Sequence, residues 1–154
     1  MSRTTPRQPG PDTTLHFVSR TPQETREWGR NFAANLSSGD VVCLYGELGA
    51  GKTCLAQGIV AGLGVGEHVP VRSPSFTFVR SYQGRERVWH WDLYRLGSAD
   101  EVEDLGWRES FDGHSIILIE WADRVFSLLP QRRWDIIITA VSFEVREWEA
   151  QRRD

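Results

Sequence analysis

One segment limits the fold more than any other, because an apolar run, a glycine-rich loop and a helical stretch follow one another without a gap. Residues 41–45 read VVCLY, residues 46–53 read GELGAGKT, and helical sequence continues to about Leu63. The loop matches the pattern Gly-x-x-x-x-Gly-Lys-Ser/Thr. A continuous apolar run is typical of a strand buried on both faces of a parallel sheet. The segment predicts an α/β protein with a phosphate-binding loop after a central strand.

Each part of this loop has a physical role in holding a phosphate chain. The glycines let the backbone curl, so that N–H groups point inward at phosphate oxygens. The helix that follows adds the positive end of its dipole. Lys52 supplies a compact charge to the β- and γ-phosphates, and the Thr53 hydroxyl is placed for Mg²⁺. These roles predict a nucleotide site at residues 46–53.

Lys52 is the single lysine of the chain, beside 17 arginines. A lysine-containing guanine-reading box is therefore excluded, and we expect the bound base to be adenine. The formal net charge of −3 argues against a protein whose main task is to grip a nucleic acid backbone. A guanidinium is wider than an ammonium and fits poorly under a loop wrapped on phosphates. We therefore expect Lys52→Arg to abolish hydrolysis of a nucleotide bound at this loop and to leave the fold intact.

Two acidic residues are candidates to complete the site. Residues 115–119 read SIILI, a second buried strand that ends at Glu120. An acidic residue at the end of a neighbouring strand commonly serves Mg²⁺ beside a P-loop. Asp92 lies within an alternating segment at 87–94, where a carboxylate needs a partner or a metal. A surface position for Glu120 and a salt bridge from Asp92 to Arg95 are the open alternatives.

Three further residues lie close to these motifs. Trp121 follows Glu120, and an indole beside a nucleotide site can stack on the base, although core packing is an alternative in a chain with seven tryptophans. Cys43 and Cys54 have no metal-binding spacing, so we expect two free thiols in a reducing, cytoplasmic compartment. No run of 18 apolar residues predicts a membrane span.

The remaining segments complete the α/β pattern. Thr21 and Pro22 begin a helix that runs to about Leu36, and a hairpin turn is expected at 83–85. Strands are predicted at 14–18, 41–45, 75–82, 87–94, 115–119, 134–141 and 143–149, and further helices at 52–63 and 98–105. The fold class is a P-loop NTPase-like, mostly parallel central sheet with added antiparallel strands and flanking helices. Residues 14–150 are expected to form one domain after a disordered, proline-rich lead-in at 1–13.

Five segments together resemble one protein family, the bacterial P-loop ATPases called TsaE (YjeE-like), which act in the biosynthesis of tRNA threonylcarbamoyladenosine. The matching segments are GELGAGKT at 46–53, SPSFTFV at 73–79, HWDLYRL at 90–96, EDLGWRE at 103–109 and IEWADR at 119–124. The P-loop alone is generic, whereas the ordered set of these segments is specific. The resemblance covers residues from about 20 to 140.

The resemblance implies roles for individual residues. Asp92 is implied in ATP hydrolysis, Thr53 and Glu120 in binding Mg²⁺, and the segment from Ser73 to Phe76 as a switch loop near the phosphates. Lys52, Asp92 and Glu120 are thus the implied catalytic residues. The implied nucleotide contacts are Thr21, Glu47, Leu48, Gly49, Ala50, Gly51, Lys52, Thr53, Cys54 and Trp121. A nucleotide contact from the segment after residue 142 is not implied.

The resemblance also implies a function. The protein would hydrolyse ATP with Mg²⁺, slowly alone and faster with partners, as a subunit of the complex that installs threonylcarbamoyl on adenosine 37 of tRNA. Its partners would be two related subunits, TsaB- and TsaD-like, and it would meet tRNA only indirectly. Two alternatives stay open: a small-molecule P-loop kinase, for which Arg132 and Arg133 would form a lid, and a nucleotide-sensing module without useful turnover.

Overall fold

A seven-stranded mixed sheet is the framework of the computed structural model, which describes residues 10, 12–47, 49–66, 68–74 and 76–154. The strands are β1 (Thr14–Ser19), β2 (Val41–Tyr45), β3 (Val79–Gln83), β4 (Arg87–Asp92), β5 (Ile116–Glu120), β6 (Arg133–Ala140) and β7 (Arg146–Arg153). The helices are α1 (Pro22–Phe32), α2 (Lys52–Gly62) and the short α3 (Trp107–Ser110), with 3₁₀ segments η1 (Ala33–Asn35), η2 (Ala99–Leu105) and η3 (Ala122–Leu128).

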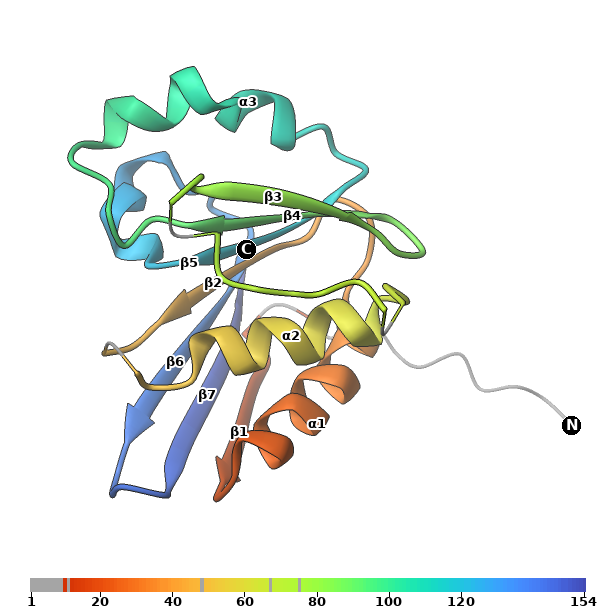
Figure 1. Cartoon of the computed structure of the whole chain (residues 1–154), viewed down its shortest axis with the longest axis vertical. Coiled ribbons are helices and arrows are strands. Elements are labelled where there is room, and N and C mark those ends of the chain that lie inside the picture. Colours follow the sequence, from red (N-terminus) through yellow and green to blue (C-terminus); the bar gives the residue numbers. More distant parts are fainter. Residues whose placement is uncertain (1–9, 11, 48, 67, 75) are drawn as a thin grey trace, which may run out of the picture.

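The order of the strands is β1-β7-β6-β2-β5-β4-β3 (Figure 1). β2 pairs in parallel with both β5 and β6, and β5 pairs in parallel with β4. β3 adds to one edge in antiparallel fashion, and β7 and β1 add to the other. This arrangement confirms the predicted fold class, a mostly parallel centre with antiparallel additions.

Helices cover the centre of the sheet on both faces. α1 and α2 lie side by side on one face, over a core that includes Leu44, Ile59 and Leu118 (Figure 1). η2, α3 and η3 cover the opposite face of β2, β4 and β5. All five residues of β5 are therefore buried, as a continuous apolar run predicts. Within the described residues, no helix is long and apolar enough to cross a membrane.

Glycines allow the two long helices to touch backbone to backbone. A Cβ atom at Gly58 would lie 2.1 Å from the carbonyl oxygen of Arg26, and one at Gly29 would lie 2.8 Å from that of Leu55. Contacts this short leave no room for a side chain at either position. α2 begins directly after the P-loop, so this contact also fixes the start of α1 relative to the loop.

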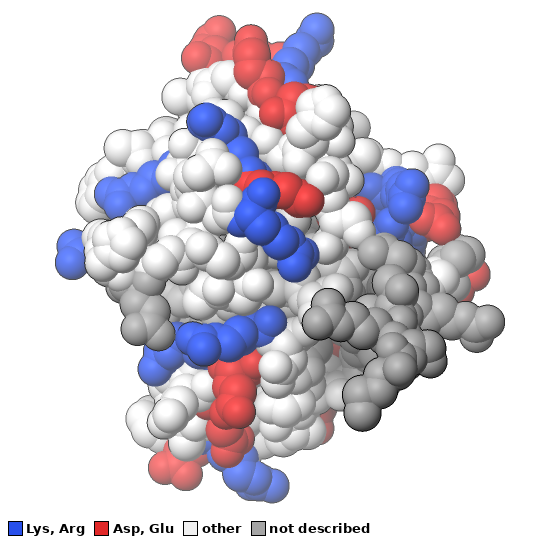
Figure 2. Space-filling view, turned by 90° about the vertical axis from the view of Figure 1, so that its right-hand side faces the viewer, with Lys and Arg blue, Asp and Glu red and all other residues white. Residues whose placement is uncertain are grey.

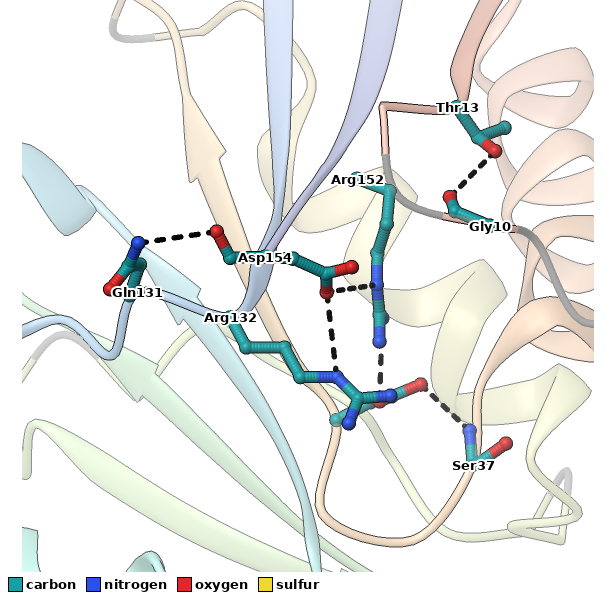
Figure 3. A network of polar contacts seen from close by, with 8 residues as sticks. Gly10, Thr13, Ser37, Gln131, Arg132, Arg152 and Asp154 are labelled. Atoms are coloured by element: carbon teal, nitrogen blue, oxygen red, sulfur yellow. Dashed lines mark hydrogen bonds and ion pairs between the residues drawn. The ribbon is translucent and has the colours of Figure 1, made fainter.

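A polar network joins the last strand to the start of β2 (Figure 3). Arg152 lies 3.4 Å from a carboxylate oxygen of Asp40, and Asp154 lies 3.7 Å from Arg132. Asp40 also accepts a hydrogen bond from the N–H of Ser37 at 2.9 Å. These contacts stabilise the end of the sheet that lies opposite the P-loop.

Charges on the face of the molecule that Figure 2 shows are mixed. Figure 2 shows the described Lys and Arg side chains interspersed with Asp and Glu rather than gathered into one basic area. On this face, the described side chains form no single basic area of the kind that grips a nucleic acid backbone.

Several predicted boundaries were wrong. The strand predicted from residue 75 begins only at Val79, because Phe78 adopts φ +66° and interrupts the extended backbone; Ser75 lies outside the described residues. The last strand runs from Arg146 to Arg153 rather than 143–149, because a turn closed by the N–H of Val141 on the carbonyl of Val145 precedes it. It thus extends past the domain end expected at residue 150.

The helices differ from prediction in smaller ways. The helix predicted to reach about Leu36 changes to 3₁₀ geometry after Phe32, and its Thr21 hydroxyl caps the N–H of Glu24 at 3.1 Å as expected. The segment predicted at 98–105 is 3₁₀ in type, and Ser98 makes no side-chain capping bond to it in the described structure. α3 and η3 were not predicted, since each is too short to show a helical period.

Candidate functional site

The P-loop leaves β2 and turns directly into α2. Gly49 and Gly51 have φ values of +78° and +110°, a region that side-chain-bearing residues rarely adopt. The N–H of Ala50 closes a turn on the carbonyl of Glu47 at 3.0 Å. The loop is thus curled as the glycine spacing predicted, and Leu48 lies outside the described residues.

Lys52 is the centre of the loop and is almost entirely buried. Its ammonium donates hydrogen bonds to the carbonyl oxygens of Gly46 and Glu47, the latter at 2.9 Å. It also lies 4.0 Å from the centre of the Trp121 ring. Burial lowers the pKa of Lys52, while the carboxylate of Glu120 opposes that shift. A phosphate group here would supply the negative charge that neutral carbonyls lack.

Glu120 faces the start of α2 from the end of β5. One carboxylate oxygen accepts a hydrogen bond from the Thr53 hydroxyl at 3.0 Å, and the other lies 2.6 Å from Nε2 of His90. The side chain is buried, so the alternative of a surface carboxylate is wrong. The structure therefore brings together the two residues predicted to bind Mg²⁺.

Asp92 lies beside Glu120 because β4 and β5 pair in parallel with these two residues in register. Its carboxylate accepts hydrogen bonds from the Ser73 hydroxyl and from the N–H of Tyr94, the latter at 3.0 Å. Ser73 opens the segment expected to act as a switch loop, so this segment is tied directly to Asp92. The two predicted acidic residues thus meet at one edge of the sheet.

Arg95 does not form the salt bridge with Asp92 that was considered as an alternative. Its guanidinium lies 4.3 Å from the centre of the exposed Phe76 ring. The ion pairs found among the described residues do not join Arg95 to Asp92. Arg95 instead contacts the end of the switch segment.

These groups line one cavity of about 500 Å³. The lining residues are Gly49, Gly51, Lys52, Thr53, Cys54, Ser73, Asp92, Tyr94, Arg95, Glu120 and Trp121. Two cations, three hydroxyls and two carboxylates converge there, which is the chemistry of a site for phosphate and a hard cation.

A second cavity, of about 480 Å³, lies on the other side of the P-loop. Gly49, Gly51 and Cys54 line both cavities. The second is completed by the start of α1 and by the β6–β7 turn, through residues Ser19, Arg20, Thr21, Pro22, Thr25, Ala50, Phe143, Glu144 and Arg146. Thr21, predicted to approach the nucleotide, thus lies beside the P-loop but away from Glu120 and Asp92.

Two residues of this second cavity were missed by the sequence analysis. Phe143 is 95% exposed, and Nε of Arg146 donates to the carbonyl of Ala50 at 3.1 Å. The resemblance did not extend past residue 142, and only the antiparallel pairing of β6 with β7 carries this turn to the P-loop. In the sequence, the turn S-F-E-V-R carries no motif that would have marked either residue.

Trp121 lies at the Lys52 end of the site. Its backbone has φ +58°, and its ring lies 5.0 Å from that of Tyr94. It is partly buried and packs against the core cluster under η2 and η3, as the core-packing alternative predicted. The same ring faces the ammonium of Lys52, so it also belongs to the cavity.

The donors present suit a magnesium ion that arrives with a nucleotide. Among the described residues, no cluster of three or more His, Cys, Asp or Glu side chains could hold a metal by itself. Mg²⁺ prefers oxygen ligands and is usually held by one or two protein groups together with phosphates and water. The hydroxyl of Thr53 and the carboxylate of Glu120 match that requirement.

The two cysteines differ sharply. Cys43 is fully buried in β2, and burial raises the pKa of its thiol to about 12. Cys54 is half-buried in the first turn of α2 and lines both cavities. Both are free thiols, as predicted.

The arginine pair considered as a kinase lid lies far from this site. Arg132 and Arg133 precede and begin β6, which runs parallel to β2, so they lie at the opposite end of the sheet from the P-loop. Arg133 pairs with Asp135 at 2.9 Å, and Arg132 is exposed. The pair therefore cannot close over a phosphate at Lys52.

Comparison with known proteins places these features in one family. The model of the family "Threonylcarbamoyl adenosine biosynthesis protein TsaE" matches residues 19–149. Relatives with the same description are 43% identical over 117 residues in Treponema pallidum and 41% identical over 134 residues in Bacillus subtilis. These matches cover 76% and 86% of this chain, and 85% and 82% of the relatives.

A solved structure agrees with the sequence matches. The crystal structure of Bacillus subtilis YdiB superposes with a TM-score of 0.79 at 32% sequence identity, covering 95% of this chain and 90% of that one. Residues 19–149, which the family model matches, include the P-loop, Asp92, Glu120 and the turn that carries Phe143 and Arg146. The chain therefore belongs to the TsaE family.

Proposed function

We propose that this protein is a Mg²⁺-dependent ATPase that acts in the cytoplasm in the biosynthesis of tRNA threonylcarbamoyladenosine. The described relatives carry that pathway in their names, which supports the biological role. One observation supports the chemistry above all others: Lys52, the Thr53–Glu120 hydrogen bond and Asp92 converge on a single cavity beside the P-loop. Each is a group that phosphoryl transfer from a nucleotide requires.

The two cavities suggest how a nucleotide lies. We place its phosphates at Lys52 and Thr53 and its nucleoside in the second cavity, between the start of α1 and the β6–β7 turn. Thr21, Phe143 and Arg146 would then contact the nucleoside, with the exposed ring of Phe143 available to cover the base. Trp121, which faces Lys52, would cover the phosphates rather than stack on the base.

Charge neutralisation and positioning carry most of the proposed reaction. Lys52 exchanges its bonds to the Gly46 and Glu47 carbonyls for bonds to phosphate oxygens. Thr53 and Glu120 would hold Mg²⁺, which supplies positive charge to the phosphate oxygens when bound. Asp92 keeps acceptor capacity beyond its bonds to Ser73 and Tyr94, so it can orient an attacking water molecule.

We further propose that partner subunits accelerate the reaction. Asp92 is hydrogen-bonded to the switch segment through Ser73, and Arg95 contacts Phe76 of the same segment. Movement of that segment would release Asp92 and Arg95 from these contacts, so that both side chains could turn toward the phosphates. The partners would be two related subunits, TsaB- and TsaD-like, and contact with tRNA would be indirect.

The test is ATP hydrolysis by the purified protein, alone and with the two partner subunits. We expect the protein by itself to release phosphate slowly and the complex to release it faster. Asp92→Asn and Glu120→Gln should lose both activities. Binding of a fluorescent ADP to the same variants separates loss of chemistry from loss of the site. Transfer of labelled phosphate to a small molecule would favour a kinase instead, and absence of turnover in the complete complex would favour a sensing module.

A further inference from the structure

We propose that His90 is a positioning residue, whose imidazole holds the carboxylate of Glu120 in the orientation that serves Mg²⁺ at Thr53. The inference rests on the proposed function, because it concerns a carboxylate proposed to bind the metal. His90 itself has no role in the reaction proposed above, which uses Lys52, Thr53, Asp92 and Glu120.

The hydrogen bonding of the buried His90 side chain indicates that it acts on Glu120. The side chain is fully buried in β4, and its Nε2 lies 2.6 Å from Oε2 of Glu120. Its Nδ1 is buried without a hydrogen-bond partner among the described residues. A buried polar atom without a partner costs free energy that an apolar side chain of similar size would avoid. Among the residues that the structure describes, the polar contact that offsets this cost is the one with Glu120.

The position of the ring follows from the sheet. β4 and β5 are parallel neighbours, and His90, two residues before Asp92, shares its face of the strand. Glu120 lies on the same face of the sheet, toward α2, where Thr53 lies. The imidazole therefore contacts the carboxylate from a position two residues earlier in the ladder and does not line the cavity.

The two contacts of Glu120 together fix its carboxylate. The terminal torsion of a glutamate is broad, so a carboxylate with one partner can rotate. Here Thr53 holds Oε1 at 3.0 Å and His90 holds Oε2 at 2.6 Å, so both oxygens are defined. A metal ligand that is oriented by a second hydrogen bond binds more tightly, and removal of such a partner typically costs about 10–100-fold in metal affinity.

Two amide substitutions separate positioning from mere space filling. The amide nitrogen of glutamine reaches about as far as Nε2 of histidine, whereas that of asparagine corresponds to Nδ1 and falls short of Glu120. His90→Gln therefore keeps a donor for the carboxylate, and His90→Asn buries a similar amide without one. Tyr82→Phe is the matched control, because Tyr82 lies beside His90 with ring centres 6.5 Å apart and its buried hydroxyl has no partner among the described residues.

The experiment measures binding of a fluorescent ADP to the full-length protein at increasing Mg²⁺ concentration. We expect His90→Asn to raise the Mg²⁺ concentration for half-saturation by about 10-fold or more, while His90→Gln and Tyr82→Phe stay within about 2-fold of the wild type. Affinity for the nucleotide without Mg²⁺ should be the same in all four proteins, because the P-loop itself is unchanged.

Each other outcome contradicts one specific statement. If the asparagine and glutamine variants shift equally, or neither shifts, His90 does not act through Glu120 and the inference fails. If the asparagine variant does not fold, a glutamine variant with an unfavourable shift in Mg²⁺ dependence also overturns it. If the wild type binds no nucleotide, the proposed function is wrong, and the inference about His90 fails with it.

Discussion

The close contact between α1 and α2 gives the sharpest prediction. In Gly58→Ala, the added Cβ would lie 2.1 Å from the carbonyl oxygen of Arg26 and within 3 Å of two further backbone atoms of that residue. Ordinary contact begins at 3.4 Å, so the helices must separate by about 1.3 Å there (3.4 − 2.1). Only backbone atoms face the new methyl group, so no flexible side chain can move away instead.

Two opposing terms set the size of the effect. Overpacking of a tight core costs about 1–3 kcal/mol, and the backbone clash places this case at the upper end. Alanine in a helix gains about 1 kcal/mol over glycine. We therefore expect a net loss of about 2 kcal/mol, which lowers the melting temperature of a domain of this size by about 4–8 °C.

The measurement is urea unfolding followed by tryptophan fluorescence, with the binding of fluorescent ADP as a second readout. Gly97→Ala is the control, because its Cβ would meet only the mobile carboxylate end of Glu101. Of the two variants, only Gly58→Ala should bind fluorescent ADP more weakly, because the separation of the helices carries Thr21 at the start of α1 away from the P-loop. A Gly58→Ala protein as stable as the wild type would show that helix propensity outweighs the clash, and would refute this account of the helix contact.

Three more predictions concern single side chains. Lys52→Arg should abolish ATP hydrolysis and still fold, because a guanidinium does not fit on the phosphates under the loop. Arg132→Lys, at the far end of the sheet, should hydrolyse ATP normally, and appreciable turnover by Lys52→Arg would contradict this prediction. A thiol reagent should modify Cys54 in the native protein, and more slowly when nucleotide is present. It should modify Cys43 only after unfolding, because Cys43 is buried and burial raises its pKa to about 12. Mass spectrometry of the labelled peptides measures both reactions. Hydrogen bonds from two backbone N–H groups lower the pKa of Asp112 from 3.8 to about 2. The contribution of Asp112 to stability is therefore present above pH 4 and is lost as the pH falls through about 2. Asp112→Asn should be less stable than the wild type at pH 7, and a difference in stability that persists at pH 2 would contradict the assignment.

The sequence was most informative where local chemistry decides the structure. The curl of the P-loop requires glycine at positions 49 and 51, and the buried runs at β2 and β5 have no other stable place than a sheet interior. The end of the sheet at which Glu120 lies was also foreseeable, since the carboxyl ends of parallel strands share one edge. The meeting of Asp92 with Glu120 and the bond between His90 and Glu120 were not foreseeable, because both depend on β4 and β5 being neighbours.

Contacts between the two ends of the chain were the part that sequence reasoning could not reach. The second cavity needs Thr21 from the first helix and Arg146 from the last strand on either side of the same loop. No local pattern specifies that β7 lies between β6 and β1. The error at the start of the last strand arose in the same region, where turn residues rather than hydrophobic alternation determine the end of the strand.

The pairing of β1 with β7 has a consequence for the order in which a nascent chain matures. β1 is synthesised first, yet its register with β7 runs from Thr14 opposite Gln151 to Ser19 opposite Arg146. The edge strand must therefore wait, unpaired, until residues 146–151 have been made, and pairings of such sequence separation form late. The wall of the second cavity that carries Phe143 and Arg146 arrives at the same moment. A ribosome-bound chain that has reached β6 but not β7 would thus offer a nucleotide the proposed phosphate site without this wall, and its affinity would rise once β7 had paired.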